Sequence, residues 1–369
     1  SYGTNGNLPP FYYRHLALYS FSGGYGDNSA IYVDSPGNAE LGWEKSNNMN
    51  FGLDLTLFKR FGLVVEYYSK LTDGLLLNVP ISYLTGFGST WQNTGSIKNN
   101  GIEVEFHSVN ISTPTGFKWR TDFTLTTQKS IVVSLPNGED IITGDGNLYK
   151  YSENQDIYSF YLSTWIGVDS RNGYGYFLKD PTKSDTTNNR VRRHADAERS
   201  IVGKAYPDII GGMNNSLSFK GVELDFLFTY SFGGSLFDYP GYFMHHDGSR
   251  SGILNLAKDV VDNYWTKPGD IVDNPMPNLD DSYRSDNWST RYIKSTDFVR
   301  LKEISIAYNL PENLTSKMHI ENVRIYGKGT NVWLWSKTKG IDPEVTLNGY
   351  RTVDTPLSKV WTIGVNLSF

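Results

Sequence analysis

Residues 222–232 read VELDFLFTYSF, and this stretch decides which fold the rest of the chain predicts. Apolar and polar side chains alternate with a period of two, which is typical of a β-strand with two different faces. One face carries three phenylalanines and a tyrosine, and the other carries Glu223 and Asp225. Such a strand fits a soluble sandwich whose apolar face points into a core. It also fits a strand with lipid on one side and water on the other.

The same alternation recurs along the chain. Counted back from the C-terminus, it predicts nine strands of alternating direction, at 48–59, 62–71, 98–110, 117–131, 207–219, 222–233, 297–309, 320–333 and 358–369. Near Glu303 the alternation changes phase, which predicts a bulge. Ser1–Gly3 are expected to form the tip of one further strand.

The connections between these strands alternate in length. Short or moderate connections lie at 59–62, 110–116, 220–221 and 309–322, and long polar loops lie at about 4–47, 72–97, 132–206, 234–294 and 334–357. Loops of this length are uncommon in a compact soluble domain. Short turns at one end and long loops at the other are typical of an outer-membrane barrel. We therefore predict an all-β fold, a transmembrane antiparallel β-barrel, with a local hairpin between 156–165 and 173–178.

The composition fits this fold. The chain has 369 residues, a net charge of −5 and 14% aromatic residues, and it contains no apolar run of about 18 residues. Barrel strands are only half apolar, so the mean hydropathy of −0.41 is compatible with a membrane. The weak acidity does not favour nucleic acid as a partner. The chain has no cysteine, which excludes disulfides. Because it opens at Ser1 without a signal sequence, we expect a processed or incomplete chain.

Six stretches, in order, resemble the SusC/RagA family of TonB-dependent outer-membrane transporters from Bacteroidetes. They are NAELGWEKSNNMNFGLDL (38–55), NTGSIKNNGIEVEF (93–106), GKAYPDIIGGMNNSLSFKGVELDFLF (203–228), WTKPGD (265–270), FVRLKEISIAYNLP (298–311) and GIDPEV (340–345). Ala39 stands where the family usually has proline. The terminal Phe369 is similar to the aromatic residue that barrel-assembly machinery reads in such proteins.

The resemblance implies a 22-stranded barrel filled by an N-terminal plug, of which this chain supplies strands 14–22 and the tip of strand 13. We expect residues 1–369 to be one unit, the C-terminal part of that barrel. The plug domain and the N-terminal strands are expected outside this chain. The implied location is the outer membrane of a Gram-negative bacterium. The implied partners are a SusD-like surface lipoprotein that caps the barrel, the plug and N-terminal barrel portion of the same transporter, TonB through that missing portion, and outer-membrane lipid.

The function that the resemblance implies is TonB-dependent active import of oligomeric nutrients. Glycan oligosaccharides are the favoured substrate, oligopeptides are the alternative, and a secreted carbohydrate-binding β-protein is a less favoured class. No enzyme is expected, because GxSxG, HExxH and Walker motifs are absent. Glu103 and Glu105 have a spacing of about 6.5–7 Å along a strand, which could suit an inverting glycosidase. A repeated polar row on a barrel wall already explains them.

Charged residues of the predicted polar faces are candidates for the lumen of the barrel. They are expected to contact the plug or line a polar path, although the inner wall of any wide barrel is polar and wet. These candidates are Glu66, Glu103, Glu105, Arg120, Asp122, Glu223 and Asp225.

Aromatic residues of the predicted loops are candidates for substrate contact, because flat rings suit the apolar faces of sugars. The alternative is that they pack on each other and on the lid. The candidates are Trp91, Tyr158, Tyr161, Trp165, Tyr174, Tyr176, Tyr239, Tyr242, Phe243 and Trp288.

No metal site and no cofactor are predicted. The neighbours His245 and His246 would point in opposite directions on a strand, which makes them poor co-ligands. The acidic loops at 144–147 and 273–286 could recruit calcium, but neither matches an EF-hand. The basic run RVRRHADAER (190–199) is predicted to be a solvated loop or a contact with the lid.

Overall fold

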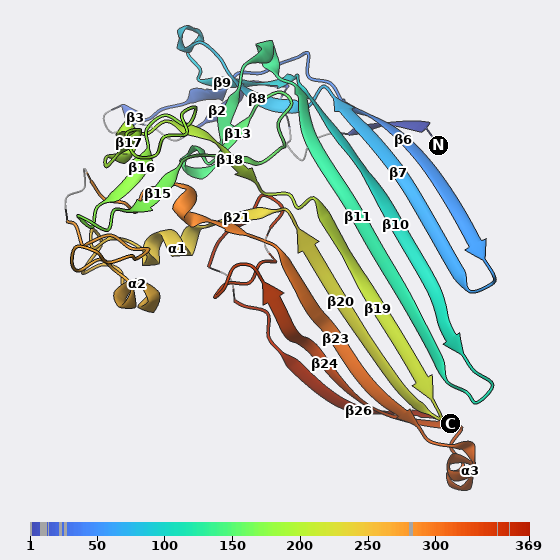
Figure 1. Cartoon of the computed structure of the whole chain (residues 1–369). Coiled ribbons are helices and arrows are strands. Elements are labelled where there is room, and N and C mark those ends of the chain that lie inside the picture. The colour runs from blue at the N-terminus through green and yellow to red at the C-terminus, as the bar shows by residue number, and fades with distance from the viewer. Residues whose placement is uncertain are drawn as a thin grey trace.

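The computed structural model describes residues 2–7, 13, 15–21, 24–25, 28–279, 283–344, 346–353 and 355–369. Its main feature is a ten-stranded antiparallel sheet whose strands follow one another in chain order (Figure 1). The strands are β1 (Tyr2–Asn7), β6 (Glu44–Leu57), β7 (Phe61–Asp73), β10 (Ser96–Ser112), β11 (Lys118–Ser134), β19 (Ile209–Phe219), β20 (Val222–Phe232), β23 (Phe298–Asn309), β24 (Asn322–Ser336) and β26 (Val360–Ser368). All nine predicted strands are confirmed, and the predicted strand tip extends to Asn7.

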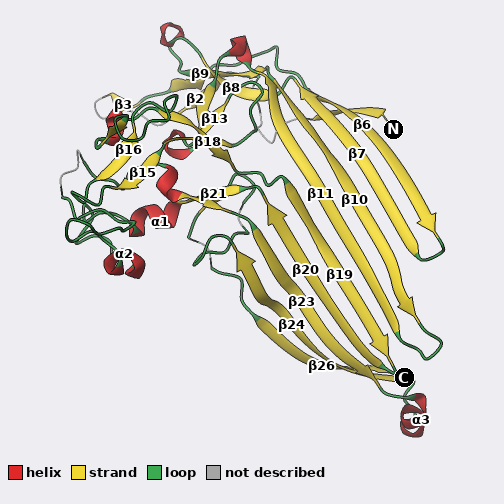
Figure 2. Cartoon of the chain, in the orientation of Figure 1, coloured by secondary structure: helices red, strands yellow, loops and turns green. Residues whose placement is uncertain are grey.

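The short connections gather at one end of the sheet, where α3 (Glu312–Thr315) and η6 (Ser316–Met318) also lie (Figure 2). Between β19 and β20 the turn is only Lys220 and Gly221, with φ of 48° and 84°. Positive φ at both positions is what a two-residue type I′ hairpin requires. A Cβ at Gly221 would lie 2.7 Å from the carbonyl oxygen of Asn309. This turn therefore requires glycine and fixes the register of the hairpin.

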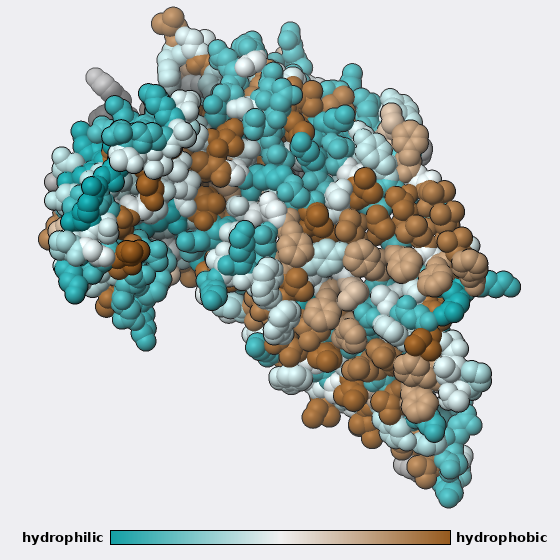
Figure 3. Space-filling model, in the orientation of Figure 1, coloured by the Kyte–Doolittle hydropathy of each residue, from teal (hydrophilic) through white to brown (hydrophobic). Residues whose placement is uncertain are grey.

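The register keeps one apolar face continuous across the whole sheet. Phe226 lies opposite Ile304, and Leu224 lies opposite Leu217 and Ile306. The same face carries Phe51, Leu53, Leu55, Val65, Tyr67, Ile102, Val104, Phe106, Phe123, Leu125, Phe228, Trp361, Ile363 and Val365. Figure 3 shows this apolar surface over the strands. Many of its side chains are exposed, for example Phe51 at 63% and Ile363 at 87%. Patches of this size mark a surface that is covered by another apolar phase.

Both edges of the sheet carry unpaired backbone groups in the described part of the chain. β1 pairs only with residues 44–49 of β6, and β26 is the last strand of the sheet. An unpaired strand edge is costly in lipid, where no water can satisfy its N–H and C=O groups. The ten strands therefore form an open wall.

The predicted phase change near Glu303 is confirmed as a β-bulge in β23. The register shifts between Leu301 and Glu303 against β24, and between Leu227 and Phe228 against β20. Beyond the bulge Arg300 lies opposite Thr229 and is 3% exposed. Its guanidinium lies 2.6 Å from Asp342, so the bulge delivers a buried cation to the loop end of the wall.

The long connections build small sheets and helices at the other end. One sheet contains β12 (Ile141–Thr143), β13 (Tyr149–Tyr151), β14 (Ser159–Ser163) and β18 (Arg199–Lys204); a second contains β15 (Trp165–Val168), β16 (Gly175–Leu178) and β17 (Arg190–Val191); a third contains β21 (Ser235–Asp238), β22 (Ile293–Ser295) and β25 (Tyr350–Arg351). Shorter pairs are β2 (Leu18–Ser20) with β5 (Tyr32–Ser35), β3 (Gly24–Tyr25) with β4 (Asn28–Ser29), and β8 (Leu76–Pro80) with β9 (Ser89–Asn93). The helices are α1 (Tyr239–Met244) and α2 (Lys258–Asp262), and the 3₁₀ turns are η1 (Tyr83–Thr85), η2 (Pro136–Gly138), η3 (Asp145–Asn147), η4 (His194–Asp196) and η5 (Thr290–Tyr292). Among the described residues, every helix is too short or too polar to span a membrane.

The hairpin predicted between 156–165 and 173–178 is only partly correct. Trp165–Val168 pairs with β16, as expected for a local hairpin. Residues 159–163, however, form β14, which pairs with β18 about forty residues later and touches β13. The aromatic alternation predicted strands here but did not specify their partners.

The loops share a hydrophobic core of their own. It contains Leu148, Tyr149, Phe160, Leu162, Ala205, Phe237 and Tyr292. Phe237 is fully buried, with its ring 4.6 Å from Trp288 and 6.1 Å from Tyr350, centroid to centroid. The contact between Phe237 and Tyr350 joins segments more than a hundred residues apart. The loops are therefore a packed layer rather than separate flexible arms.

The facing of the wall can be tested by placing arginine on each face at one depth. Phe226→Arg puts a charge on the apolar face and is expected to block assembly of the full-length protein, because such a charge costs about 2–4 kcal/mol at the bilayer midplane. Ser305→Arg lies on the polar face, directly opposite Asp225, and is expected to assemble normally. Assembly is measured as outer-membrane protein with heat-modifiable migration on a gel. Equal levels of the two variants would contradict this facing. Thr229 is a poorer control position, because it lies opposite Arg300.

The loop core can be tested separately from the wall. Phe237→Ala removes a fully buried ring and is expected to cost the loop layer about 3–5 kcal/mol. The barrel should still assemble, while limited proteolysis of intact cells should cut the loops much faster than in the parent protein. Leu84→Ala is the control, because Leu84 is 99% exposed at the tip of the β8–β9 hairpin. Equal cleavage of both variants would show that the loops do not fold around this core.

Candidate functional site

The seven charged candidates all lie on the polar face of the wall, opposite the apolar residues. Hydrogen-bonded register carries this face from strand to strand without interruption. Glu66 and Glu103 are direct cross-strand neighbours on it. The seven residues are Glu66, Glu103, Glu105, Arg120, Asp122, Glu223 and Asp225. Whether they contact a plug or a substrate stays a prediction.

The polar face has two zones of different charge. Towards the short turns, an open cavity of about 350 Å³ is lined by Lys118, Arg120, Glu223, Asp225 and their neighbours. There Glu223 lies 3.0 Å from Arg324, and His107 contacts Asp122. This zone is mixed in sign and largely paired.

The second zone lies on β6, β7 and β10 and is acidic. Asp54, Glu66, Glu103 and Glu105 are exposed, and none of them makes an ion pair with a residue that the structure describes. Direct opposition of Glu66 and Glu103 is unfavourable for like charges. High dielectric at an exposed surface keeps that cost small. The polar face therefore changes in charge from strand to strand. It is acidic on β6, β7 and β10, and its charges are mixed and largely paired in the other zone.

Most of the aromatic candidates pack on other aromatic residues. The ring of Tyr239 lies 4.8 Å from Phe243, 5.2 Å from Tyr350 and 5.9 Å from Trp288. Tyr242 contacts Tyr239, Phe243, Trp288 and Tyr292, and Tyr158 contacts Tyr149, Tyr151 and Tyr206. The geometry therefore favours the alternative reading for Tyr158, Tyr239, Tyr242, Phe243 and Trp288, in which the loop aromatics stabilise one another.

Cations cover several of the remaining aromatic rings. Lys150 lies over Tyr161, Arg190 over Tyr176, Arg192 over Tyr174 and Arg291 over Trp165. Cation–π contacts of this kind hold a guanidinium in a fixed plane. Trp91 lies apart from this group, in the β8–β9 hairpin, where its carbonyl accepts a hydrogen bond from Asn38. Only Tyr174 and Trp165, among the ten aromatic candidates, line the cavities described next.

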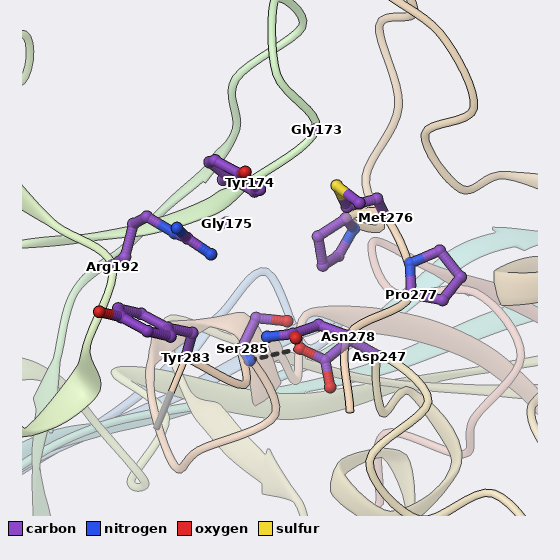
Figure 4. Close-up of a pocket in the computed structure, with 11 residues that line it drawn as sticks. Gly173, Tyr174, Gly175, Arg192, Asp247, Met276, Pro277, Asn278, Tyr283 and Ser285 are labelled. Atoms are coloured by element: carbon purple, nitrogen blue, oxygen red, sulfur yellow. Dashed lines mark hydrogen bonds between the residues drawn. The ribbon is translucent and has the colours of Figure 1, made fainter. Parts of the chain in front are cut away.

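Three cavities lie in the loop layer; the second shares lining residues with the first, and it shares Asn274 with the third. A cavity of about 190 Å³ is lined by Tyr174, Arg192, Asp247, Met276 and Tyr283, among others (Figure 4). A second, of about 290 Å³, shares Asp247, Pro275 and Pro277 with the first and is otherwise mostly apolar. The third, of about 660 Å³, is lined by Trp165, His245, Arg291 and their neighbours.

Asp247 forms part of the wall between the first two cavities. It is 6% exposed, and its Oδ2 accepts a hydrogen bond from the backbone N–H of Ser285 at 2.6 Å. Its Oδ1 is buried and has no hydrogen-bond partner among the described residues. Burial raises the pKa of Asp247, the Ser285 N–H opposes that shift, and the nearby Asp286 carboxylate adds to it. A buried carboxyl with a free oxygen is costly unless something else satisfies it.

The sequence reading missed Asp247 and Arg192 as a pair. It considered Asp247 only beside two histidines, and Arg192 only within a basic run. The two residues are far apart along the chain, and no spacing rule connects them. Arg192 is adjacent to β17, and Asp247 follows α1, so their proximity depends on how the two loops pack.

The histidines of the His245–His246–Asp247 stretch do not converge. His245 Nε2 lies 3.2 Å from Asp259, whereas His246 is fully buried and its Nδ1 accepts the N–H of Gly248 at 3.1 Å. Within the part of the chain that the structure describes, no three His, Asp or Glu side chains are grouped to hold a metal ion. In the acidic loop 144–147, Gly146 packs against Trp288. Residues 280–282 of the other acidic loop lie outside the described residues.

The chain resembles known proteins over its whole length. It is 30% identical to the TonB-dependent receptor P3 of Formosa agariphila, with all of this chain and 39% of the receptor aligned. It is 26% identical to the TonB-dependent receptor SusC of Bacteroides thetaiotaomicron, over 90% of this chain and 32% of SusC. The chain thus spans about two fifths of the length of receptor P3 and about one third of the length of SusC. No family model matches the sequence.

Solved structures give the same result. The RagAB peptide transporter superposes with a TM-score of 0.81 at 28% identity, and the RagAB peptide importer in its open-open state with 0.85 at 27%. Both alignments cover all of this chain and about two fifths of the other, 40% and 39% respectively. The predicted resemblance and the predicted fold are confirmed: this chain belongs with the C-terminal barrel portion of the SusC/RagA-like TonB-dependent transporters.

Proposed function

We propose that this chain is part of the barrel wall of an outer-membrane TonB-dependent importer of oligomeric nutrients. The observation that carries the proposal is the ten-stranded wall, which is apolar on one face, polar on the other and matched over its full length by RagAB. The two unpaired edges require further strands in lipid. We propose that the remaining strands of the longer transporter close the barrel and that a plug fills its lumen.

The polar face suits contact with a plug. Its mixed zone and its acidic zone present charges that a folded domain inside the lumen can pair. Energy coupling to TonB would act through that plug, because the described residues form wall and loops only. A SusD-like surface lipoprotein is the proposed lid, and the packed loop layer is the surface on which it would close.

Oligopeptides are the cargo that we now favour, in place of glycan oligosaccharides. The preference for glycans rested on aromatic loop residues as sugar platforms and on the frequent use of glycans in the family. Most of these rings are occupied by other rings or by cations. The solved structures that superpose well are described as peptide transporters. The loop cavity that holds Arg192 and Asp247 also offers charge of both signs, which peptides can match at their termini and backbone.

The cargo can be tested with the complete transporter and its lid in the native host. A defined mixture of oligopeptides and a panel of neutral oligosaccharides are supplied, and their depletion from the medium is measured. We expect peptide depletion to be lost when the transporter gene is deleted and also when TonB is inactivated. Oligosaccharide depletion should be unchanged in the strain that lacks only this transporter.

Two results would contradict parts of this proposal. Loss of oligosaccharide uptake alone would retain the importer and reject peptide cargo. Unchanged uptake of every substrate, in a strain where loss of the transporter is verified, would reject nutrient import.

A further inference from the structure

The smallest of the three loop cavities is lined by side chains of opposite charge, Arg192 and Asp247. Neither side chain belongs to the ten-stranded sheet or to the hydrophobic core of the loops. Figure 4 shows Arg192 reaching from one side towards the middle of this cavity, with Tyr174 and Tyr283 beside it. Asp247, Met276 and Pro277 lie on the other side. The cavity is set between the β16–β17 segment and the loop that follows α1.

Arg192 is held in place by rings and has its hydrogen-bonding edge unused. Its guanidinium carbon lies 3.6 Å from the ring centroid of Tyr174 and 4.4 Å from that of Tyr283. Rings on two sides fix the plane of the guanidinium without using its N–H groups. Among the described residues, Arg192 makes neither an ion pair nor a hydrogen bond. Neighbouring arginines differ, since Arg190 pairs with Asp169 and Arg193 with Asp196.

Asp247 supplies a second unsatisfied group across the cavity. Its Oδ2 is occupied by the Ser285 N–H, but its buried Oδ1 lacks a partner among the described residues. An acceptor of this kind in a low-dielectric site gains from an N–H or O–H donor. Arg192 therefore offers donors to an anion, and Asp247 places a carboxyl group on the opposite wall, where its unpaired Oδ1 is covered by protein atoms.

The size and the remaining wall of the cavity restrict what can enter. About 190 Å³ is smaller than the pockets of about 300–1,000 Å³ that hold whole small-molecule ligands, so the cavity fits one end of a longer ligand. Met276, Pro275 and Pro277 give it an apolar side. The C-terminal residue of a peptide has a carboxylate, a backbone N–H and a side chain, and these match the three features.

We propose that this cavity is a subsite for the C-terminal residue of an oligopeptide. The terminal carboxylate binds the free edge of the Arg192 guanidinium in a bidentate pair, which is the geometry that arginine prefers with carboxylates. The N–H of the terminal residue faces Asp247, and its side chain packs on Met276 and the two prolines. This inference rests on the proposed function in one respect, namely that peptides reach the loop layer.

The experiment compares two peptides that differ only at the C-terminus. A hexapeptide with a free carboxylate and the same hexapeptide as its C-terminal amide are titrated against the purified complete transporter with its lid. We expect the parent complex to bind the free acid at least tenfold more tightly, because a hydrogen bond to a charged group contributes about 1.5–3 kcal/mol. In Arg192→Gln the two peptides should bind equally, at the affinity of the amide.

Arg193→Gln is the matched control. It removes the same charge from the adjacent position, where the side chain is exposed and, among the described residues, pairs only with Asp196 at 3.9 Å. It should keep the full preference for the free acid. Since the readout is a ratio between two peptides on one protein, a partial loss of folded complex in Arg192→Gln does not imitate the expected result.

Three outcomes would overturn the subsite. The first is equal binding of acid and amide by the parent complex. The second is an acid preference that persists in Arg192→Gln. The third is binding of oligogalacturonate that depends on Arg192 while neither peptide binds, which would assign the carboxylate pocket to acidic glycans. The first two leave peptide import standing, whereas the third rejects peptides as cargo.

Discussion

The two-residue period of an extended chain is the constraint on which the rest of this structure depends. A slip of one residue in any hairpin would exchange the apolar and polar faces of every later strand. The wall keeps its phase through nine antiparallel pairings because tight turns, such as Lys220–Gly221, leave no freedom of register. The register also shifts near both ends of the β10–β11 pairing and at the bulge beside Glu303, where it shifts against both neighbouring strands, so the faces are preserved there. Backbone satisfaction in lipid then requires the sheet to close.

The loops are stabilised differently from the sheet. They are long, polar segments, and their own hydrophobic core holds them in a fixed structure. Their aromatic residues supply large buried areas with few rotamers to fix, and ring-to-ring contacts add to that stabilisation. Phe237 and Trp288, from the connection between β20 and β23, thereby join Tyr350 from the connection between β24 and β26. A ring used in this way has little surface left for a sugar. In the proposed importer, recognition in the loop layer then falls to the charged groups that the rings hold in position.

This difference explains how much could be predicted from the sequence. Strand positions, their directions, the facing of residues such as Phe226 and Glu223, and the bulge all follow from local periodicity and connection length. The partners of β14 do not, because alternation marks a strand without naming its neighbour. The approach of Arg192 to Asp247 depends on packing between two loops, and nothing in either segment encodes it. The aromatic candidates were selected because they are aromatic residues in predicted loops. Residue type does not show whether a neighbouring side chain already covers the face of the ring.

The charged residues of the sheet and those of the loop layer lie in different electrostatic environments. Charges such as Glu66 and Glu103 stand on an exposed wall, where water and salt screen them and a single contact contributes little. In the proposed importer such a surface would favour no ligand strongly. Arg192 and Asp247 lie at a small cavity, and Asp247 is withdrawn from water to the point that its pKa rises. Lower dielectric strengthens each contact there and makes a missing partner costly. In the proposed importer, selection among cargo is therefore better placed in the loop layer, before the substrate meets the wall.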